Sequence, residues 1–320
     1  MTGRICGTGS ALPRLRVTND DLSKIMDTSD EWIRSRTGIE ARHLATEETT
    51  TSLSVEAAKQ ALEEAGVQAE DLDLIIAATV SADRLIPTLS CEIQSALGAK
   101  HATAFDIGAA CSGFLFALST VQAYIMSGQC KKALIVGAEV LSKIMDWEDR
   151  STCVLFGDGA GAAVICAEDT GIIQVVHGSD GAKGMVLACD NRPVNNPYKK
   201  NTADLSYVSM NGQEVYKFAV RTVPLCIHEA LEKSGTAADD ISCFVLHQAN
   251  LRIIEAVAKR LEQPMEKFPI NLNECGNISA ASVPILLDNV NRRGMIKKGD
   301  KIVLAGFGAG LTWGAAVLTW

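Results

Sequence analysis

Two patterns of apolar residues alternate along the chain. Near-continuous apolar runs such as "LIIAAT" (74–79) and "ALIVGA" (133–138) are typical of strands that are buried on both faces of a sheet. Other stretches have helical character, for example "ALEEAG" (61–66), which ends in a glycine suited to a helix C-cap. The alternation predicts an α/β protein in which helices cover the sheets.

The chain also contains an internal repeat. The segments "ALEEAGVQAEDL" (61–72) and "ALEKSGTAADDI" (230–241) are identical at six of twelve positions, at an offset of 169. The same offset relates "KALIVG" (132–137) to "KIVLAG" (301–306). Matches that recur in the same order indicate a tandem duplication. We therefore expect two halves that pack about a pseudo-twofold axis.

A third match helps to place the boundary between the halves. "GAAV" occurs at 161–164 and again at 314–317, where the offset falls to 153. The predicted halves are residues 1–170 and 171–320. The polar, turn-rich segment 183–207 is predicted to be a loop or cap on the second half.

Composition narrows the possible functions. The chain has 320 residues, 47% of them hydrophobic, and a net charge of −8, which disfavours a nucleic-acid binder. No apolar run is long enough to span a membrane, and the first residues lack the apolar core of a signal peptide. The ten cysteines form no CxxC pair, so we expect reduced thiols in the cytoplasm and no metal site.

One cysteine stands out because of the repeat. Cys111 lies in "DIGAACSGF", and its counterpart at position 280 lies in "NECGNISAAS", which also contains Asn277. Both stretches are small-residue turns that lead into helices, and a pseudo-twofold axis would bring them together. His247 closes an apolar strand, "CFVLH". We therefore expect Cys111, His247 and Asn277 to face one interior site.

These residue types suit acyl transfer. A helix start should lower the pKa of the Cys111 thiol and favour a thiolate that attacks thioesters. The backbone N–H of Cys111 and one from the glycine-rich loop 306–314 could hold the oxyanion. His247 and Asn277 can both donate hydrogen bonds while neutral, as an enolate requires. Structural roles for all three residues remain open at this point, and "GDGAG" (157–161) is interpreted as tight packing.

Six motifs together carry a family resemblance. They are "DEWIRSRTGIEARH" (30–43), "DIGAACSGF" (106–114), "DRSTCVLFGDGAGAAV" (149–164), "LHQANLRI" (246–253), "GNISAAS" (276–282) and "GFGAGLTWG" (306–314). With them the sequence closely resembles the β-ketoacyl-acyl-carrier-protein synthase III family, over essentially the whole chain. The resemblance implies the thiolase-like fold, two duplicated α/β halves layered αβαβα, and a homodimer.

The resemblance also implies a reaction. An acyl-CoA primer acylates Cys111, and malonyl-acyl-carrier protein then loses CO2 and attacks the acyl group. His247 and Asn277 would be the decarboxylation pair. The product is a 3-oxoacyl-acyl-carrier protein that initiates type II fatty-acid synthesis. Coenzyme A enters as part of the substrate, and no separate cofactor or metal is expected.

Further site residues follow from matching positions in the family. Trp32, Arg36, Arg150 and Asn250 match positions that contact coenzyme A. A positive patch of Lys217, Arg252 and Lys259 is expected to dock the acidic carrier protein. Ile86 lies in a segment that resembles the loop lining the primer pocket across the dimer, where a bulkier aromatic can occur.

Two positions depart from the family pattern. Ala309 stands in the glycine loop where a further glycine is common, and its backbone N–H is the expected second oxyanion donor as long as alanine accepts its φ. Ile278 stands beside Asn277 where threonine is usual, which bears on local packing.

Other functions remain as alternatives. A thiolase would carry a second cysteine in the loop 306–314, and an elongating synthase would carry a histidine in place of Asn277. A related condensing enzyme of secondary metabolism keeps the same three residues. A Cys-His-Asn hydrolase would release free acid without a malonyl donor, and a carrier-binding scaffold without activity would not need the three residues.

Overall fold

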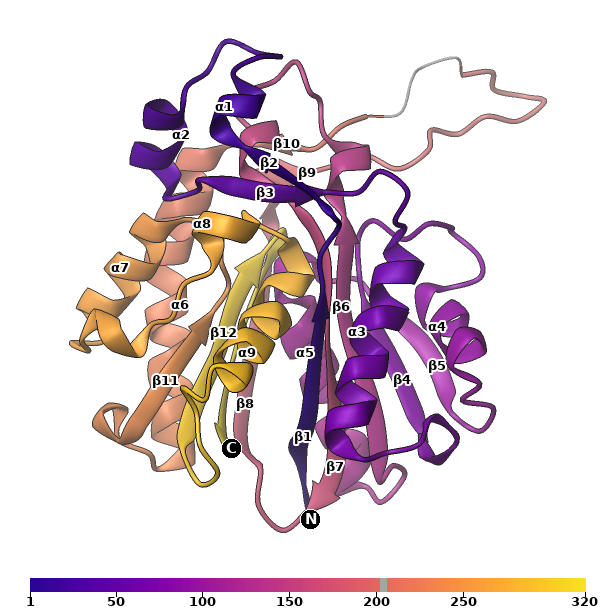
Figure 1. Cartoon of the computed structure of the whole chain (residues 1–320), viewed down its shortest axis with the longest axis vertical. Helices are drawn as coiled ribbons and strands as arrows, with labels where there is room; N and C mark the ends of the chain where they lie inside the picture. The colour runs from indigo at the N-terminus through magenta and orange to yellow at the C-terminus, as the bar shows by residue number, and fades with distance from the viewer. Residues whose placement is uncertain (202–205) are drawn as a thin grey trace.

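The computed structural model describes residues 1–201 and 206–320, and two large sheets dominate it (Figure 1). The first sheet has the strand order β1-β7-β6-β4-β5, and the second has the order β11-β12-β13-β8. The strands of the first sheet are β1 (Thr2–Ala11), β4 (Leu74–Ala78), β5 (Thr103–Ile107), β6 (Lys132–Val140) and β7 (Asp158–Glu168). Those of the second are β8 (Ile172–Gly184), β11 (Ile241–Leu246), β12 (Lys301–Gly308) and β13 (Gly310–Thr319).

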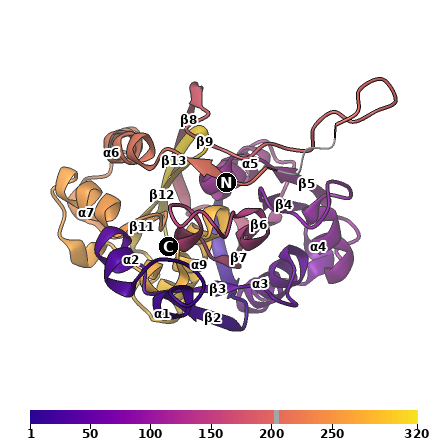
Figure 2. The same cartoon turned by 90° about the horizontal axis from the view of Figure 1, so that it is seen from above.

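Helices form three further layers around and between the sheets. Helices α3 (Thr50–Ala65) and α4 (Leu89–Leu97) cover the outer face of the first sheet. Helices α6 (Gly212–Ser234) and α7 (Leu251–Arg260) cover the outer face of the second, on the opposite side of the molecule (Figure 2). Helices α5 (Gly113–Met126) and α9 (Ser282–Arg292) lie between the sheets and share one apolar core with both. The result is the predicted αβαβα sandwich.

The predicted repeat is present in the backbone. Helices α3 and α6 both end at a left-handed glycine, Gly66 with φ 62° and Gly235 with φ 64°. Ala110 and Ser279, which are also 169 residues apart, have φ 45° and 44° in the short turns before α5 and α9. The strand directions match as well. Strands β4 and β6 form a parallel pair in the first sheet, and their counterparts β11 and β12 form a parallel pair in the second. The repeat therefore extends to local backbone geometry.

The two halves differ at one edge. Strand β5 has no counterpart in the second sheet, because the residues 169 positions later form the short helix α8 (Leu272–Cys275). Strand β7 ends the first sheet at Glu168 and β8 begins the second at Ile172. The chain thus changes sheets near residue 170, and the division into halves 1–170 and 171–320 stays a prediction.

A small cap covers the upper end of both sheets in Figure 1. It contains α1 (Asn19–Leu22), α2 (Asp30–Thr37), and the antiparallel pair β2 (Leu15–Thr18) and β3 (Ala41–Leu44). Of the predicted loop 183–207, residues 202–205 lie outside the described residues. Around that loop, β9 (Leu187–Ala188) pairs with β10 (Ser209–Met210) close to the cap.

The segment 157–161 is a site of close packing, as predicted. A side chain on Gly161 would bring a Cβ within 2.6 Å of the Ile285 backbone nitrogen. A Cβ on Gly157 would lie 2.4 Å from the Cys275 carbonyl oxygen. Glycine is therefore required at positions 157 and 161, because α8 and α9 approach the backbone there too closely for a side chain.

Candidate active site

Cys111 lies in the turn between β5 and α5. A short 3-10 turn, Ala110–Ser112, precedes the first residue of α5, Gly113, so the thiol comes just before the helix as the sequence predicts. The side chain is buried, with a relative exposure of 7%. Ala110 has a positive φ, which residues other than glycine rarely adopt. The backbone of this turn is therefore constrained.

The prediction of a lowered pKa for this thiol is wrong for the protein at rest. Burial raises the pKa of Cys111 to about 12, although a hydrogen bond with the Ser279 side chain acts in the opposite direction. The free-energy cost of burying a thiolate exceeds the stabilisation that this one hydrogen bond gives it. The sequence shows the helix start, whereas it does not show the degree of burial. Burial therefore favours the neutral form of the Cys111 thiol.

His247 follows β11 directly. Its backbone N–H donates to the Ala305 carbonyl at 2.8 Å, and its ring makes an edge contact with Phe307 at a centroid distance of 5.3 Å. Its Nδ1 is buried and has no hydrogen-bond partner in the described part of the chain. Burial lowers the pKa of His247 to about 3. The imidazole is therefore neutral at ordinary pH, as a hydrogen-bond donor to an enolate should be.

Asn277 is held by three hydrogen bonds. Its backbone N–H donates to Leu155 at 2.9 Å, and its carbonyl oxygen accepts from Gly157 at 3.0 Å. Its side-chain Oδ1 accepts from the backbone N–H of Ser279 at 2.9 Å. Since the oxygen is engaged in this way, the amide presents its NH2 group as a donor. Ile278, the departure beside it, packs with Cys275, Ala281 and Ile285.

Two residues show that Cys111, His247 and Asn277 lie together. A Cβ on Gly306 would lie 3.4 Å from the His247 Cβ and 3.5 Å from the Cys111 carbonyl oxygen. The Ser279 backbone N–H donates to the Asn277 side chain at 2.9 Å, and the turn Ser279–Ala281 packs against the turn Ala110–Ser112 that carries Cys111. The structure thus brings the thiol, the imidazole and the amide to one buried site between the sheets.

The glycine-rich loop closes over the thiol. A Cβ on Gly308 would lie only 2.6 Å from the Cys111 backbone nitrogen. Ala309 is not among the described residues with positive φ, so alanine fits there without strain. The Thr312 hydroxyl accepts a hydrogen bond from the Ser112 hydroxyl at 2.7 Å and lies 2.9 Å from the Ala309 carbonyl oxygen. These contacts fix the loop beside the Cys111 N–H.

Replacement of Gly308 by alanine should disable the site without unfolding the protein. The added methyl group would meet the Cys111 N–H, which is the expected oxyanion donor. Loss of one such donor costs about 3 kcal/mol of transition-state stabilisation, or roughly a hundredfold in rate. Acylation rates from intact mass measure the effect. Gly181→Ala is the control, because a Cβ at Gly181 meets nothing within 4 Å. Equal rates for the two variants would contradict the placement of the donor.

The four residues expected at coenzyme A lie around α2 and the start of α7. The Arg36 and Arg150 guanidinium carbons lie 4.8 and 5.2 Å from the centre of the Trp32 ring. Arg150 also hydrogen-bonds the backbone carbonyl and the carboxylate of Asp27. The Asn250 side chain caps α7 and donates to the Arg36 carbonyl at 3.1 Å. The structure therefore gathers all four residues at the cap.

The three predicted docking cations are exposed but differ in their contacts. Arg252 on α7 donates to the Ser35 carbonyl at 2.7 Å, beside the cap. Lys259 lies in the last turn of α7. Lys217 lies on α6 and pairs with Glu214 at 2.8 Å within its own helix. Arg252 and Lys259 thus share one helix, while Lys217 belongs to its neighbour.

Ile86 lies at an exposed tip of the segment between β4 and α4. Its relative exposure is 85%, and that of Leu85 is 65%. The base of this segment is fixed, because the Asp83 carboxylate accepts from the Thr50 and Thr51 backbone N–H groups at 3.1 and 2.8 Å. An apolar tip on a fixed base suits contact with another surface.

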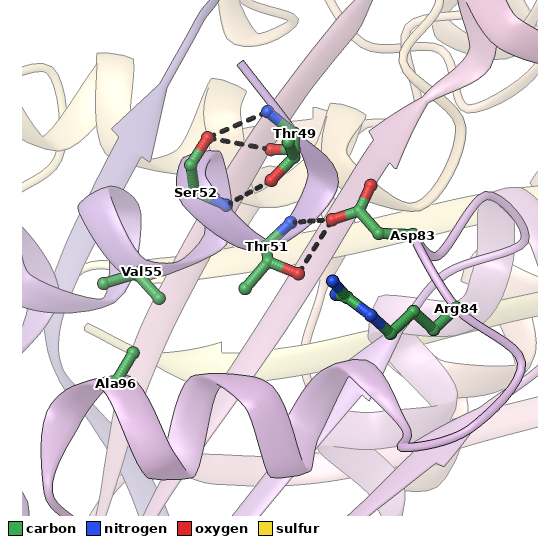
Figure 3. Close-up of a pocket in the computed structure, with 7 residues that line it drawn as sticks. All are labelled: Thr49, Thr51, Ser52, Val55, Asp83, Arg84 and Ala96. Carbon is green, nitrogen blue, oxygen red and sulfur yellow. Dashed lines mark hydrogen bonds between the residues drawn. The ribbon is translucent and has the colours of Figure 1, made fainter. Parts of the chain in front are cut away.

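A surface hollow of about 530 Å³ lies beside the same segment (Figure 3). It is lined by Thr49, Thr51, Ser52, Val55, Asp83, Arg84 and Ala96. None of the predicted catalytic residues is among them. Several of its polar groups bond to one another, as the Asp83 contact with the Thr51 hydroxyl at 2.8 Å shows. We therefore separate this hollow from the site around Cys111.

Sequence reasoning missed four residues at the site. They are Ser112 and Thr312, which join the Cys111 turn to the glycine loop, Ser279, which binds the Asn277 side chain, and Glu139, a buried carboxylate. One signal was available for Glu139, since it is a lone charge at the end of the apolar run "ALIVGAEV". The other three are small polar residues whose contacts cross between the halves.

Within residues 1–201 and 206–320, no group of three or more His, Cys, Asp or Glu side chains could hold a metal ion. No helix in this described part of the chain has both the length and the apolar character needed to cross a membrane. The ten cysteines are free thiols.

Comparisons with known proteins agree on one family. Residues 105–181 match the family "3-oxoacyl-[acyl-carrier-protein (ACP)] synthase III", and residues 231–320 match its C-terminal part. The chain is 50% identical to β-ketoacyl-[acyl-carrier-protein] synthase III of Clostridium novyi, over 99% of this chain and 98% of that protein. Such identity over the full length shows the family.

Solved structures show the same relationship. The crystal structure of 3-oxoacyl-[acyl-carrier-protein] synthase III from Aquifex aeolicus superposes with a TM-score of 0.94 at 45% identity, covering 99% of this chain and all of that one. A priming β-ketosynthase from the R1128 polyketide pathway gives 0.93 at 38% identity, covering 99% of this chain and 96% of that one. The chain therefore belongs to the β-ketoacyl-acyl-carrier-protein synthase III family of acyl-transferring condensing enzymes and has their thiolase-like fold.

Proposed function

We propose that this protein condenses a short acyl-CoA primer with malonyl-acyl-carrier protein through an acyl-Cys111 intermediate, and so initiates type II fatty-acid synthesis. The observation that carries the proposal is the meeting of a buried thiol, a neutral imidazole and an oriented amide at one site. One group can be acylated, and the other two can donate hydrogen bonds to a second reactant.

Acylation is the first step. The Cys111 sulfur attacks the thioester carbonyl, a carbon–sulfur bond forms, and coenzyme A leaves with the thiol proton. The oxyanion of the tetrahedral intermediate accepts hydrogen bonds from the backbone N–H groups of Cys111 and Ala309. The close approach of Gly308 to the Cys111 nitrogen supports this arrangement.

Decarboxylation and condensation follow at the same place. Malonyl-carrier protein loses CO2, and the electron pair of the broken bond forms an enolate. His247 and the Asn277 NH2 group donate hydrogen bonds to the enolate oxygen, and its carbon attacks the acyl group on Cys111. A neutral His247 supports this role, because it donates a hydrogen bond and transfers no proton. The Cys111 sulfur leaves as a thiolate when the 3-oxoacyl product forms, and it takes up a proton from solvent to return to the thiol.

Coenzyme A binds at the cap in this proposal. The adenine would lie between the Trp32 ring and the Arg150 guanidinium, which now face each other at 5.2 Å. Arg36 and Asn250 would contact the rest of the coenzyme from the start of α7. The coenzyme is a part of the substrate, so no separate cofactor is needed.

The carrier protein docks on Arg252, Lys259 and Lys217 in this proposal. An Arg252→Glu or Lys259→Glu variant should weaken the use of malonyl-carrier protein about five- to tenfold, since each removes an attraction to an acidic partner. Acylation by acyl-CoA should not change. Lys59→Glu, at an exposed position on α3, is the control of equal charge. Equal loss in both half-reactions would argue against docking at this surface.

The protein acts as a homodimer in this proposal. The exposed apolar tip at Leu85 and Ile86 supports it, because such a tip gains from burial against a second copy. A side chain at position 86 would then shape the primer pocket of the partner. The size of Ile86, smaller than an aromatic ring, favours primers with some length or branching.

A condensing role in secondary metabolism is the second candidate. The similarity to a priming β-ketosynthase of a polyketide pathway favours it specifically. Both candidates carry out the same condensation reaction. They differ in the primer and in the carrier protein that supplies the malonyl group. A thioester hydrolase is a third class, which would release free acid without a malonyl donor.

One experiment tests the proposal. The protein is mixed with a panel of short acyl-CoAs, intact mass is recorded, and malonyl-carrier protein is then added. We expect one acyl adduct that is discharged only when the malonyl partner arrives, and the adduct identifies the primer. An adduct lost to water alone would support a hydrolase, and the absence of any adduct would refute the acyl-enzyme mechanism.

A further inference from the structure

One buried amide beside the active site has no role in the mechanism above. Gln248 follows His247 directly and has a relative exposure of 1%. Its Nε2 donates to the Leu246 carbonyl at 2.9 Å, so this side chain bonds the residue before His247. Its Oε1 accepts hydrogen bonds from the backbone N–H groups of Asn271 and Leu272, both at 3.2 Å. Gln248 thus connects the end of β11 to the start of α8.

The contact made by Oε1 caps the start of α8. The first N–H groups of a helix have no partner within the helix and need an acceptor from outside it. The Asn271 side chain, at the N-cap position, makes no capping hydrogen bond. Gln248 supplies the acceptor instead, from a position 23 residues earlier in the chain. The start of α8 is therefore held against the end of β11.

Helix α8 carries this contact to Asn277. The Cys275 N–H donates to the Asn271 carbonyl at 3.0 Å. The Gly276 N–H donates to the Leu272 carbonyl at 2.9 Å. The residues held at the start of α8 are thus bonded to the two residues that precede Asn277. A shift of the start of α8 would therefore move the Asn277 amide as well.

The two donors of the decarboxylation step are held by different parts of the fold. The backbone of Asn277 bonds to the segment 155–157 in the first half, whereas the His247 backbone bonds to β12 in the second sheet. Both donors must nevertheless reach one enolate oxygen, and an error of about 1 Å in such a position can cost about 10²-fold in rate. The bonds between Gln248 and α8 join the segments that carry the two donors.

We propose that Gln248 fixes the distance between His247 and Asn277, and that it is a positioning residue for decarboxylation. The proposal rests on the proposed function and deepens it. Gln248 contacts no substrate in this scheme. It holds α8 so that the Asn277 NH2 group and the His247 imidazole reach the same enolate oxygen. Acylation uses the Cys111 thiol and backbone N–H groups, so it does not depend on Gln248.

The deciding variant is Gln248→Met, which keeps the length of the side chain and removes its hydrogen bonds. We expect acylated protein to decarboxylate malonyl-carrier protein about ten- to a hundredfold more slowly, with the loss in kcat and not in KM. Acylation by acyl-CoA should change less than about threefold. A similar loss in both half-reactions would overturn the proposal, because a generally loosened fold impairs both.

A double variant tests whether Gln248 acts through Asn277. In Asn277→Ala protein the positioned donor is already absent, so the addition of Gln248→Met should slow decarboxylation by less than about threefold more. A purely structural role predicts the same factor in both backgrounds. That result would contradict the proposal.

Matched variants protect these tests against damage to the fold. Gln94→Met on α4 removes another amide that bonds to the backbone, since its Nε2 donates to the Ala99 and Ala102 carbonyls at 3.2 and 2.7 Å. It should leave both half-reactions unchanged. Gln248→Glu keeps an acceptor oxygen and should restore part of the lost rate. If Gln248→Met does not fold, Gln248→Asn takes its place, because its amide is one methylene group shorter, and the same outcomes decide.

Failure of the proposed function would look different. If wild-type protein forms no acyl adduct and releases no CO2 from malonyl-carrier protein, the proposed function fails before the variants are compared. If the wild type does both and Gln248→Met releases CO2 equally fast, only the positioning role of Gln248 fails.

Discussion

Replacement of Cys111 by alanine is expected to abolish the acyl adduct and to reduce condensation by roughly 10⁴-fold or more, as the loss of a covalent nucleophile does in other enzymes. Neither of the other two site residues can form a thioester, since the His247 imidazole and the Asn277 amide contain no sulfur. Intact mass after mixing with acyl-CoA detects the adduct. Slow decarboxylation of malonyl-carrier protein should persist, because both hydrogen-bond donors remain.

The control uses a second buried thiol. Cys226 on α6 is buried, and burial raises its pKa to about 12, as it does that of Cys111. Its sulfur contacts the Val176 carbonyl at 3.8 Å, in the core between the second sheet and the outer helices α6 and α7. Cys226→Ala should therefore keep the full adduct. An adduct that disappears in this variant and persists in Cys111→Ala would place the nucleophile elsewhere.

Removal of the two donors should affect the other half-reaction. We expect His247→Ala and Asn277→Ala each to slow decarboxylation by roughly 10² to 10³, in the range found for lost oxyanion donors. Acylation should change less than tenfold, since neither side chain holds the first oxyanion in this mechanism. Release of CO2 and formation of the adduct are measured separately. A variant that loses acylation and keeps decarboxylation would reverse the assignment.

The pH dependence of decarboxylation gives an independent check. Because the pKa of His247 is lowered to about 3, the imidazole stays neutral above that value. The decarboxylation rate of pre-acylated protein should therefore be flat between pH 5 and 8. A rise or fall centred near the ordinary pKa of histidine, about 6.5, would show that His247 changes protonation in the working range.

The repeat explains how much of the fold the sequence could predict. The helix C-caps and the turn before each central helix recur at an offset of 169, which the matching letters at 61–72 and 230–241 reveal. The strand order recurs as well, although the offset falls to 153 at the last strand. The missing counterpart of β5 could not be predicted in this way. Residues 272–276 carry none of the matches, and their helix depends on contacts with β3 in the cap.

The sequence predicted which residues form the site, but it did not predict the pKa of the Cys111 thiol. The offset pointed to the turns that hold Cys111 and Asn277, because they begin equivalent helices. The raised pKa of Cys111 depends on burial between two sheets, which no local pattern contains. Cys111 and Ser279 come from different halves, so the packing of their two turns against each other is visible only in the folded chain.

The paired turns before α5 and α9 also bear on the history of the enzyme. A protein of half this length, paired with itself, would have placed two identical turns against each other at its twofold axis. In such an ancestor any change of residue occurs twice, so a thiol on one side entails a thiol on the other. Fusion of the genes removes that restriction. One turn here keeps Cys111, while the other carries Ala280 beside Ser279 and Asn277. The division of labour between nucleophile and donors is thus a product of broken symmetry, available only after duplication within a single chain.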